Sequence, residues 1–550
     1  MQRAWLREFN ALGLQLRPQA ANKVTEFLKR CEDPNRMAET LVENTKAYLR
    51  SRQGVVESVI DLGVIQTVID CMAEAAKNPG GVTTQQDAAR QGVEGLELGD
   101  GIQVYNVMTD VRPYDFQRAS KAWTPSPSPS TLFSGPDVKA KIYADRYQLL
   151  LQRLLIEGKV VTEHEAVAGG VLPGQRILTL VESLAGNPGR KLTFGLIKRT
   201  QDEGARRWAI EDLHQLYPLE LKMSESDHLL TDGSIVLAEG ELVGGCFHAD
   251  RIEVPPAVTR ESSDDKDEFP ALAFGGDLTD EQLRTLAALE PDTAENMYVV
   301  LCEVHLDSAR VLEKLADVFH GYEESTPPAA YIFMGSFCSS AFLPTADGVR
   351  AYRDGFERLQ FMMKNLNNHI NRGTRFIFIP GPKDPGAQTL PRMPLPGYLT
   401  ADLAKEVPGV ILATNPCRVR HFSRELVFFR HDVLRLLRRH EVVPLRQPET
   451  GESPSAEHVR VEMVRFLLDQ AHLVPLPLEE SNIIWHFDHA LRLYPLPHAV
   501  FVGGISQPFD CAYQECKFCS VGPFSRDASF YAYYPETGML ESCDVPDQAG

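Results

Sequence analysis

"RFIFIPGPKDPG", residues 375–386, decides the fold class of the last part of this chain. It opens with a short apolar run rich in aromatic and β-branched side chains, which predicts a buried strand. The glycines and prolines that follow predict a tight loop directly after the strand. Pro382, Lys383 and Asp384 lie in that loop, so a cation and a carboxylate are placed just beyond the strand's carboxyl end.

Similar apolar runs precede and follow this stretch, and helical segments separate them. The runs are "MYVVLCEV" (297–304), "AAYIFMGSF" (329–337) and "GVILATNP" (409–416), with "RVLEKLADVFHGY" (310–322) among the helical segments. Near-continuous apolar strands between helices are typical of a sheet that is covered on both faces. The sequence therefore predicts an α/β domain in this part of the chain.

Length and charge limit the classes of function that are open to the chain. Its 550 residues exceed one ordinary core, so two to four domains are expected. The formal net charge of −19 argues against a protein that grips nucleic acid by bulk electrostatics, because such binding depends on clustered Lys and Arg. The first residues do not resemble a signal peptide, and no apolar run is long enough to span a membrane.

Ten cysteines are scattered along the chain, mostly inside apolar stretches. This distribution is typical of reduced, buried thiols in an intracellular protein rather than of a disulfide framework. It predicts a protein of the cytosol or the nucleus.

Composition shifts divide the chain and predict a multidomain α+β protein. Helical stripes occupy the first part, and Pro-Ser alternation such as "WTPSPSPST" (123–131) predicts a linker. Short alternating strands with Gly turns then predict a small barrel, for which the OB-fold is the commonest choice. The expected parts are a helical domain at 1–75, a flexible linker at 76–131, a helical connector at 132–174, an OB-fold at 175–256 and an α/β domain at 257–550.

The predicted barrel offers few features of a nucleic-acid binder. Arg206, Arg207 and Trp208 are followed at once by Glu211 and Asp212. Because single-strand binding by OB-folds uses aromatics beside basic residues, a structural barrel is favoured over a DNA-binding one.

The strand ends of the α/β domain resemble those of calcineurin-like phosphoesterases. That family binds two metal ions through Asp-x-His, Gly-Asp-x-x-Asp, Gly-Asn-His-Asp/Glu and Gly-His-x-His motifs, each at a strand end. The corresponding positions here are Glu303, His305, Ser336, Pro382, Lys383, Asp384, Gly504 and Ser506.

Three of these four motifs have lost essential ligands. Ser336 replaces a bridging carboxylate with a neutral hydroxyl, and Lys383 places an ammonium where a cation would bind. The resemblance therefore implies a phosphoesterase fold without catalytic residues, bound metal or cofactor. Glu303 and His305 are interpreted as a hydrogen-bonded pair, and an active metal-dependent phosphoesterase remains the alternative.

Three further patterns contain residue types that can carry chemistry. Cys511, Cys516 and Cys519, with Cys543, approach the spacing of zinc ligands, but free thiols are favoured and the question stays open. His486 and His489 in "WHFDHA" are interpreted as part of a packed amphipathic helix. The basic stretch at 430–440 is interpreted as the solvated face of a helix.

Several longer stretches resemble the B-subunit family of DNA polymerase epsilon. They are "FSGPDVKAKIYADRYQLLLQRLL" (133–155), "IVLAEGELVGGCFHADRIEVPP" (235–256), "ATNPCRVRHFSRELVFFRHDVL" (413–434) and "IWHFDHALRLYPLPHAV" (484–500), together with "PGPKDPG" (380–386). The order of helical module, barrel and degenerate phosphoesterase domain is also that of the family. The B-subunits of polymerases delta and alpha are the nearest alternatives.

This resemblance implies a non-catalytic, nuclear accessory subunit in leading-strand DNA replication. Its partners would be the zinc-containing C-terminal domain of the catalytic subunit, the replicative helicase through GINS, and indirectly the small histone-fold subunits. It implies weak or complex-dependent contact with DNA and no contact with a membrane. A different class of function, autonomous single-strand binding by the barrel, would require tight, salt-dependent binding by the chain alone.

Overall fold

The computed structural model describes residues 101–117, 122–202, 205–260, 280–290, 295–446 and 454–546, with Leu278 and a few residues between positions 15 and 65. The chain forms two units, Met1–Ala88 and Ala89–Gly550. In the first unit, β1 (Gln15–Leu16) and β2 (Val59–Ile60) pair in parallel. Most of the predicted helical domain at 1–75, and the predicted linker up to residue 100, lie outside the described residues.

The predicted α/β strands form one sheet of the second unit. Its strand order is β16-β15-β14-β13-β22-β23, with parallel pairing from β16 to β13. The strands are β13 (Tyr298–Cys302), β14 (Ala330–Met334), β15 (Arg375–Ile379), β16 (Val410–Leu412), β22 (Ser529–Tyr534) and β23 (Met539–Asp544). Every residue of β13 and β14 is buried, as expected for a sheet covered on both faces.

A second six-stranded sheet has the order β20-β21-β19-β18-β17-β3. Its strands are β3 (Ile102–Tyr105), β17 (Cys417–His421), β18 (Arg424–Arg430), β19 (Ala499–Gly503), β20 (Phe509–Tyr513) and β21 (Cys516–Val521). The two sheets pack face to face, because one buried cluster contains Val300 and Ile332 from the first sheet and Phe428 and Phe501 from the second. A β-sandwich is therefore the centre of this unit.

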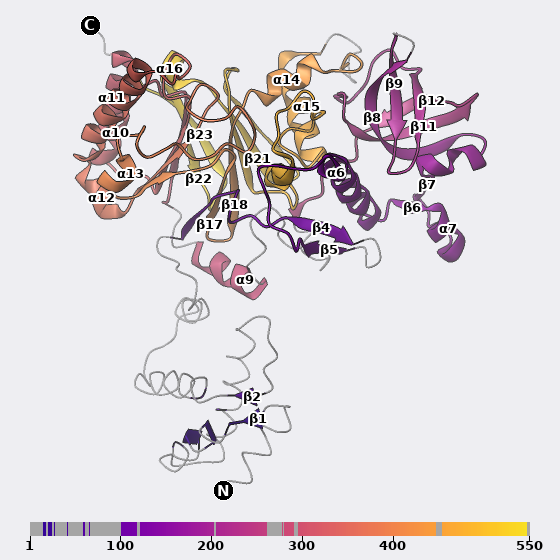
Figure 1. Ribbon diagram of the computed structural model, residues 1–550, viewed down its shortest axis with the longest axis horizontal. Coiled ribbons are helices and arrows are strands. Elements are labelled where there is room, and N and C mark those ends of the chain that lie inside the picture. Colours follow the sequence, from indigo (N-terminus) through magenta and orange to yellow (C-terminus); the bar gives the residue numbers. More distant parts are fainter. Residues whose placement is uncertain are drawn as a thin grey trace. The chain divides into compact units, whose positions relative to one another are not determined.

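Helices cover the outer faces of both sheets (Figure 1). On the first sheet they include α10 (Ala309–Glu324), α11 (Ala346–Met363), α12 (Asn367–Arg372) and α13 (Leu403–Glu406). On the second they include α14 (Val433–Arg439) and α15 (Ala456–Asp469), while α9 (Asp280–Leu289) and α16 (Phe524–Asp527) are connecting helices. Side chains such as Leu315 of α10 and Leu467 of α15 are fully buried, and each contributes about 1.5–3 kcal/mol.

Strands β8 to β12 close into a barrel, because β11 pairs with both β12 and β8, while β6 and β7 extend the sheet beyond β8. The strands of this sheet are β6 (Val160–Thr162), β7 (Arg176–Leu178), β8 (Lys191–Asp202), β9 (Ala205–Glu211), β10 (Leu216–Leu221), β11 (Ile235–Val243) and β12 (Cys246–Glu253), with α7 (Glu163–Gly169) and η1 (Val181–Gly186) between them. Phe247 of the barrel and Val464 of α15 belong to the same buried cluster. The barrel lies within the predicted OB-fold at 175–256, but its sheet extends into the predicted helical connector through β6.

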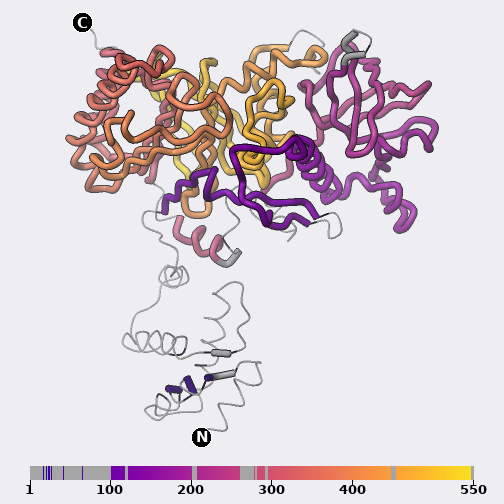
Figure 2. The backbone as a smooth tube through the Cα atoms, in the orientation of Figure 1, coloured from indigo at the N-terminus to yellow at the C-terminus, as the bar shows by residue number. Residues whose placement is uncertain are grey.

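The predicted flexible linker at 76–131 is wrong for its second half. β3 joins the second sheet, and β4 (Tyr114–Gln117) pairs with β5 (Ala122–Pro125). Trp123 is buried, donates from Nε1 to Oε1 of Gln152 at 2.9 Å, and lies under the guanidinium of Arg492. The indigo course of this segment toward α6 (Pro136–Ile156) can be followed in Figure 2. A buried tryptophan thus fixes a segment whose prolines suggested mobility.

None of the helices that the structure describes is both long enough and apolar enough to cross a membrane.

Candidate functional site at the strand ends

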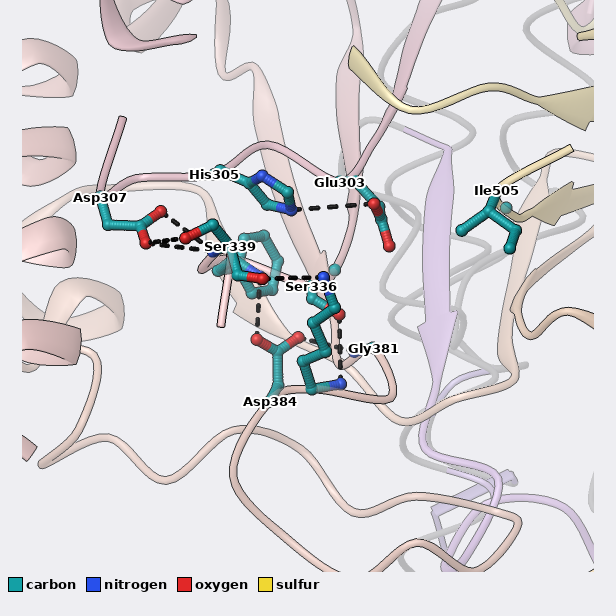
Figure 3. Close-up of polar contacts among 12 residues, drawn as sticks. Glu303, His305, Asp307, Ser336, Ser339, Gly381, Asp384 and Ile505 are labelled. Atoms are coloured by element: carbon teal, nitrogen blue, oxygen red, sulfur yellow. Dashed lines mark hydrogen bonds and ion pairs between the residues drawn. The ribbon is translucent and has the colours of Figure 1, made fainter. Parts of the chain in front are cut away.

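The four predicted motif positions meet at one edge of the sandwich. Parallel pairing aligns Cys302, Met334 and Ile379, the last residues of β13, β14 and β15. In the second sheet, the register pairs Arg430 with Gly503 at the ends of β18 and β19. Because the carboxyl ends of parallel strands share one edge, the loops that carry the motif residues converge there. Figure 3 shows Glu303, His305, Ser336 and Asp384 gathered at this edge.

The centre of this edge is occupied by the guanidinium of Arg430, whose side chain is fully buried. Nε donates to the carbonyl oxygen of Gly335 at 2.6 Å. Nη1 donates to the carbonyl oxygen of Gly503 at 3.0 Å, and Nη2 donates to Oε1 of Glu303 at 2.5 Å. One cation therefore links the ends of β13, β14 and β19.

The charge of Arg430 is held in place by its neighbours. Burial disfavours the charged form, but Cys302, Asp432 and Glu303 outweigh it and raise the pKa of Arg430. Nη1 also lies 3.3 Å from Oδ1 of Asp432. The opposite charges and backbone carbonyls satisfy a buried cation that would otherwise be very unfavourable.

Glu303 is directed toward this cation by an unusual backbone conformation. Its φ is 53°, in the left-handed region that non-glycine residues adopt at a cost of about 1–2 kcal/mol. Its N–H donates to the carbonyl oxygen of Met334 at 2.8 Å, and its carbonyl accepts from the N–H of Ser525. Strained backbone conformations of this kind are common at active sites and ligand-binding sites, where the surrounding contacts impose them.

His305 lies beside Glu303, with Nε2 3.7 Å from Oε2 (Figure 3). Its Nε2 is buried and makes no hydrogen bond within the described structure. Burial lowers the pKa of His305, and the charges of Lys383 and Arg430 lower it further, while Glu303 opposes them. The imidazole is consequently neutral at pH 7, so its pairing with Glu303 lacks an ionic component.

The loop after β15 is held by Asp384 rather than opened toward a ligand. Oδ1 accepts from the N–H of Phe337 at 2.8 Å and Oδ2 accepts from the N–H of Gly381 at 2.7 Å. The hydroxyl of Tyr352 also donates to Oδ1. Burial raises the pKa of Asp384 to about 6, although these hydrogen bonds favour the charged form.

The remaining motif residues also make internal contacts. The hydroxyl of Ser336 is buried and accepts from the backbone N–H of Lys383 at 3.2 Å. Nζ of Lys383 donates to the carbonyl oxygen of Ser339 at 2.8 Å. Pro382, which lacks a side-chain donor, and the half-buried Ser506 offer no strong metal ligand, and Gly504 offers no side chain at all.

These residues do not fit a binuclear metal centre. Glu303 already accepts from Arg430, and among the described residues no third His, Cys, Asp or Glu joins Glu303 and His305 closely enough to complete a metal-binding group. A guanidinium also repels a divalent cation placed at the same edge. The geometry instead makes this edge a rigid, internally neutralised connection between two sheets.

The cysteine pattern does not assemble into a zinc site. Cys516 belongs to the core cluster on one face of β21, while Cys519 belongs to the cluster between the sheets. Successive side chains of a strand point to opposite faces, and the odd spacing of these two separates them. Burial raises the pKa of Cys511 to about 11, and burial likewise raises the pKa of Cys516 and of Cys519, so these thiols stay protonated.

The two histidines of "WHFDHA" lie in a 3-10 segment, η3 (Trp485–Leu491), rather than in the predicted amphipathic α-helix. Nδ1 of His486 lies 3.0 Å from the backbone N of Thr131, and Nε2 of His489 lies 3.2 Å from the carbonyl oxygen of Val111. The histidines thus fasten the segment expected as a linker and do not converge on an ion.

Sequence reasoning missed Arg430, the most informative residue of this edge. The expected solvated helix face at 430–440 is wrong for this residue, since the helix begins only at Val433 and Arg430 ends a buried strand. The signal was present in "ELVFFR", an apolar run that ends in a cation. Asp307 was also missed, although it accepts from the N–H and the hydroxyl of Ser339 and closes the loop after β14.

The second unit matches two known family profiles, one of which describes an OB-fold domain. Residues 298–511 match the profile of the DNA polymerase alpha/epsilon B-subunit family, and residues 136–256 match that of the DNA polymerase epsilon subunit 2-like OB-fold domain. The chain is 29% identical to the B-subunit of DNA polymerase epsilon of Arabidopsis thaliana, with 97% of each chain covered.

Relatives in other kingdoms are similar to the chain at comparable levels. DNA polymerase epsilon subunit 2 of Homo sapiens is 28% identical, covering 98% of this chain and 97% of its own. The B-subunit of DNA polymerase epsilon of Schizosaccharomyces pombe is 31% identical over 63% of this chain and 60% of its own. Because the two profiles and these relatives extend over the barrel and the sandwich, the chain belongs to the B-subunit family of DNA polymerase epsilon.

Proposed function

We propose that this chain is a non-catalytic scaffold subunit, nuclear in location, that binds the C-terminal zinc domain of the catalytic subunit of DNA polymerase epsilon. The observation that carries the proposal is the buried guanidinium of Arg430 at the strand ends. At this edge the protein's own side chains balance one another's charges. Such an edge can support a large binding surface, but it offers no Lewis acid or activated water for hydrolysis.

In this proposal the second unit combines an OB-fold with a phosphoesterase-like domain that has lost its chemistry. The N-terminal helical domain, on the chain that precedes residue 101, would contact the replicative helicase through GINS, and the histone-fold subunits would join indirectly. A tether between two binding modules makes the second contact effectively intramolecular, so the polymerase would stay near the leading strand of the fork.

The barrel surface supports a structural role rather than autonomous DNA binding. Arg199 lies over the ring of Trp208 and within 3.7 Å of Asp232, and Lys198 forms an ion pair with Glu211. Cations that already have acidic partners release few counterions on binding DNA, so weak affinity is expected. Contact with DNA would then come through the assembled polymerase.

The test is purification of the tagged full chain from its native cells, followed by a wash at moderate salt. Recovery of a large polymerase catalytic subunit in near-equal amount is the expected result. Recovery of the catalytic subunit of polymerase delta or alpha would reassign the chain within the replicative polymerases. Recovery of the chain alone would contradict the scaffold proposal.

A further inference from the structure

The outer face of the barrel brings together three side chains that the strand-end site does not involve. β10 and β12 pair in parallel, and the register places Glu220 directly opposite His248. Cys246 precedes His248 by two residues, so both side chains project from the same face of β12. The intervening Phe247 is fully buried in the core, which directs its two neighbours outward.

The positions of these side chains are fixed by the adjoining hairpin. β11 and β12 are joined at Gly244 and Gly245, whose φ angles are 59° and 80°. Positive φ at both central residues is the geometry of a tight two-residue hairpin turn. Cys246 is the first residue after that turn and pairs with Val243 across it. The thiol is therefore presented from a rigid strand rather than from a loose loop.

The donor atoms of Glu220, Cys246 and His248 all lie within 4.8 Å of one another. Nδ1 of His248 is 2.9 Å from Oε2 of Glu220. Ligands at about 2.0–2.3 Å from a tetrahedral zinc ion lie roughly 3.3–3.8 Å apart, so only small side-chain rotations separate this arrangement from a coordinating one. Glu220 is 62% exposed, which leaves an open path from solvent.

We propose that Glu220, Cys246 and His248 form a zinc-binding site on the outer face of the barrel. Thiolate sulfur, imidazole nitrogen and carboxylate oxygen are the three donor types that zinc takes from proteins. Three protein ligands leave a fourth position for water or for a further donor. Glu241 on β11 lies opposite His248 on its other side and is placed to approach that position.

The electrostatics of this face favour a cation. Burial and the negative charge of Glu220 raise the pKa of the Cys246 thiol, while a hydrogen bond with the backbone of Glu220 and the charge of Arg207 on β9 oppose this shift. A zinc ion would replace the repulsion between thiolate and carboxylates by attraction to both. Binding displaces the thiol proton, so the affinity should increase with pH. The site is independent of the proposed scaffold function.

The first experiment titrates the full chain with Co²⁺, whose bond to a thiolate gives a charge-transfer absorption band in the near ultraviolet. One Co²⁺ per chain with this band, displaced by Zn²⁺, is expected for the wild type. Cys246→Ser should abolish the band, and His248→Gln should weaken binding at least about tenfold. Cys543→Ser is the matched control, because Cys543 is also half-buried and should leave the band unchanged.

The second experiment measures alkylation of Cys246 by mass spectrometry, with and without Zn²⁺. Zinc should protect Cys246 in the wild type, and this protection should be lost in Glu220→Gln, in which the thiol is intact. Circular dichroism checks that each variant is folded. The proposal is overturned if no band forms, if the band persists in Cys246→Ser, or if zinc leaves the alkylation of Cys246 unchanged.

Discussion

The strand-end edge of the sandwich and the outer face of the barrel both carry residue types that can serve as metal ligands, yet they differ in what surrounds them. At the strand ends, Glu303 is buried and its carboxylate is matched by the guanidinium of Arg430. On the barrel, Glu220 is open to solvent and lies beside the half-buried His248 and a thiol. A buried carboxylate requires a permanent counter-charge from the protein, whereas an exposed one does not. Because of this difference in burial, the carboxylate of Glu303 is already paired with Arg430, whereas the exposed carboxylate of Glu220 remains available to a metal ion.

The largest expected effect comes from removing the internal cation. Arg430→Met leaves Glu303 as a buried, unpaired carboxylate, and breaking such a pair costs about 3–5 kcal/mol. Chemical denaturation of the full chain should show this loss of unfolding free energy. Arg438→Met removes an exposed arginine of α14 and should change stability by less than about 0.5 kcal/mol. Equal losses in the two variants would show that Arg430 is not a structural cation.

Zinc should stabilise the barrel by a smaller amount. A ligand present at 100 times its dissociation constant stabilises the folded state by about 2.7 kcal/mol. Thermal unfolding with and without Zn²⁺ should show a higher transition temperature for the wild type but not for Cys246→Ser. Glu303→Gln should keep the full increase with zinc, because its carboxylate belongs to the other region. Loss of the zinc effect in Glu303→Gln would mean that the two sites are not separate.

A double-mutant cycle measures the coupling between Glu303 and Arg430. Combining Glu303→Gln with Arg430→Met removes both charges, so the double variant should be more stable than the sum of the single losses predicts. The interaction energy should be about 2 kcal/mol, within the range for residues in direct contact. Additive losses would mean that the 2.5 Å contact contributes little.

The smallest effect is a pH dependence that arises from Asp384. Its folded pKa of about 6 exceeds the usual value of 3.8, so the folded state holds a proton that the unfolded state has released. Its contribution to stability is therefore present at low pH and is lost as the pH rises through about 6. Between pH 5 and pH 7 the stability lost through the titration of Asp384 is about 1 kcal/mol.

Asp384→Asn removes that titration, so its deficit relative to the wild type should shrink by this amount from pH 5 to pH 7. Urea denaturation at the two pH values provides the measurement. The control is Asp354→Asn, on the exposed face of α11. Its loss of unfolding free energy relative to the wild type should be the same at pH 5 and at pH 7. A deficit of Asp384→Asn that grows with pH would reverse the sign and contradict a raised pKa.

Local patterns in the sequence were enough to predict the apolar strands of the sandwich, because residues such as Val300 and Ile332 are buried whatever their partners are. The degenerate motif positions could also be placed, since each follows a recognisable strand. Arg430 could not, because its burial depends on β18 lying beside β19, which is distant in the sequence. The same holds for Glu220 and His248, which only the parallel pairing of β10 and β12 brings together. Trp123 was the overlooked signal against a flexible linker.

The guanidinium of Arg430 occupies the part of the strand-end edge where a phosphoesterase would bind metal ions. The most direct measurement is calorimetric titration of the full chain with Mn²⁺, in the wild type and in Glu303→Gln, with hydrolysis of a phosphodiester followed in parallel. Because Arg430 already neutralises Glu303, we expect the same weak Mn²⁺ binding in both proteins and no hydrolysis that depends on Glu303. Stoichiometric Mn²⁺ binding that is lost in Glu303→Gln, together with hydrolysis, would contradict it.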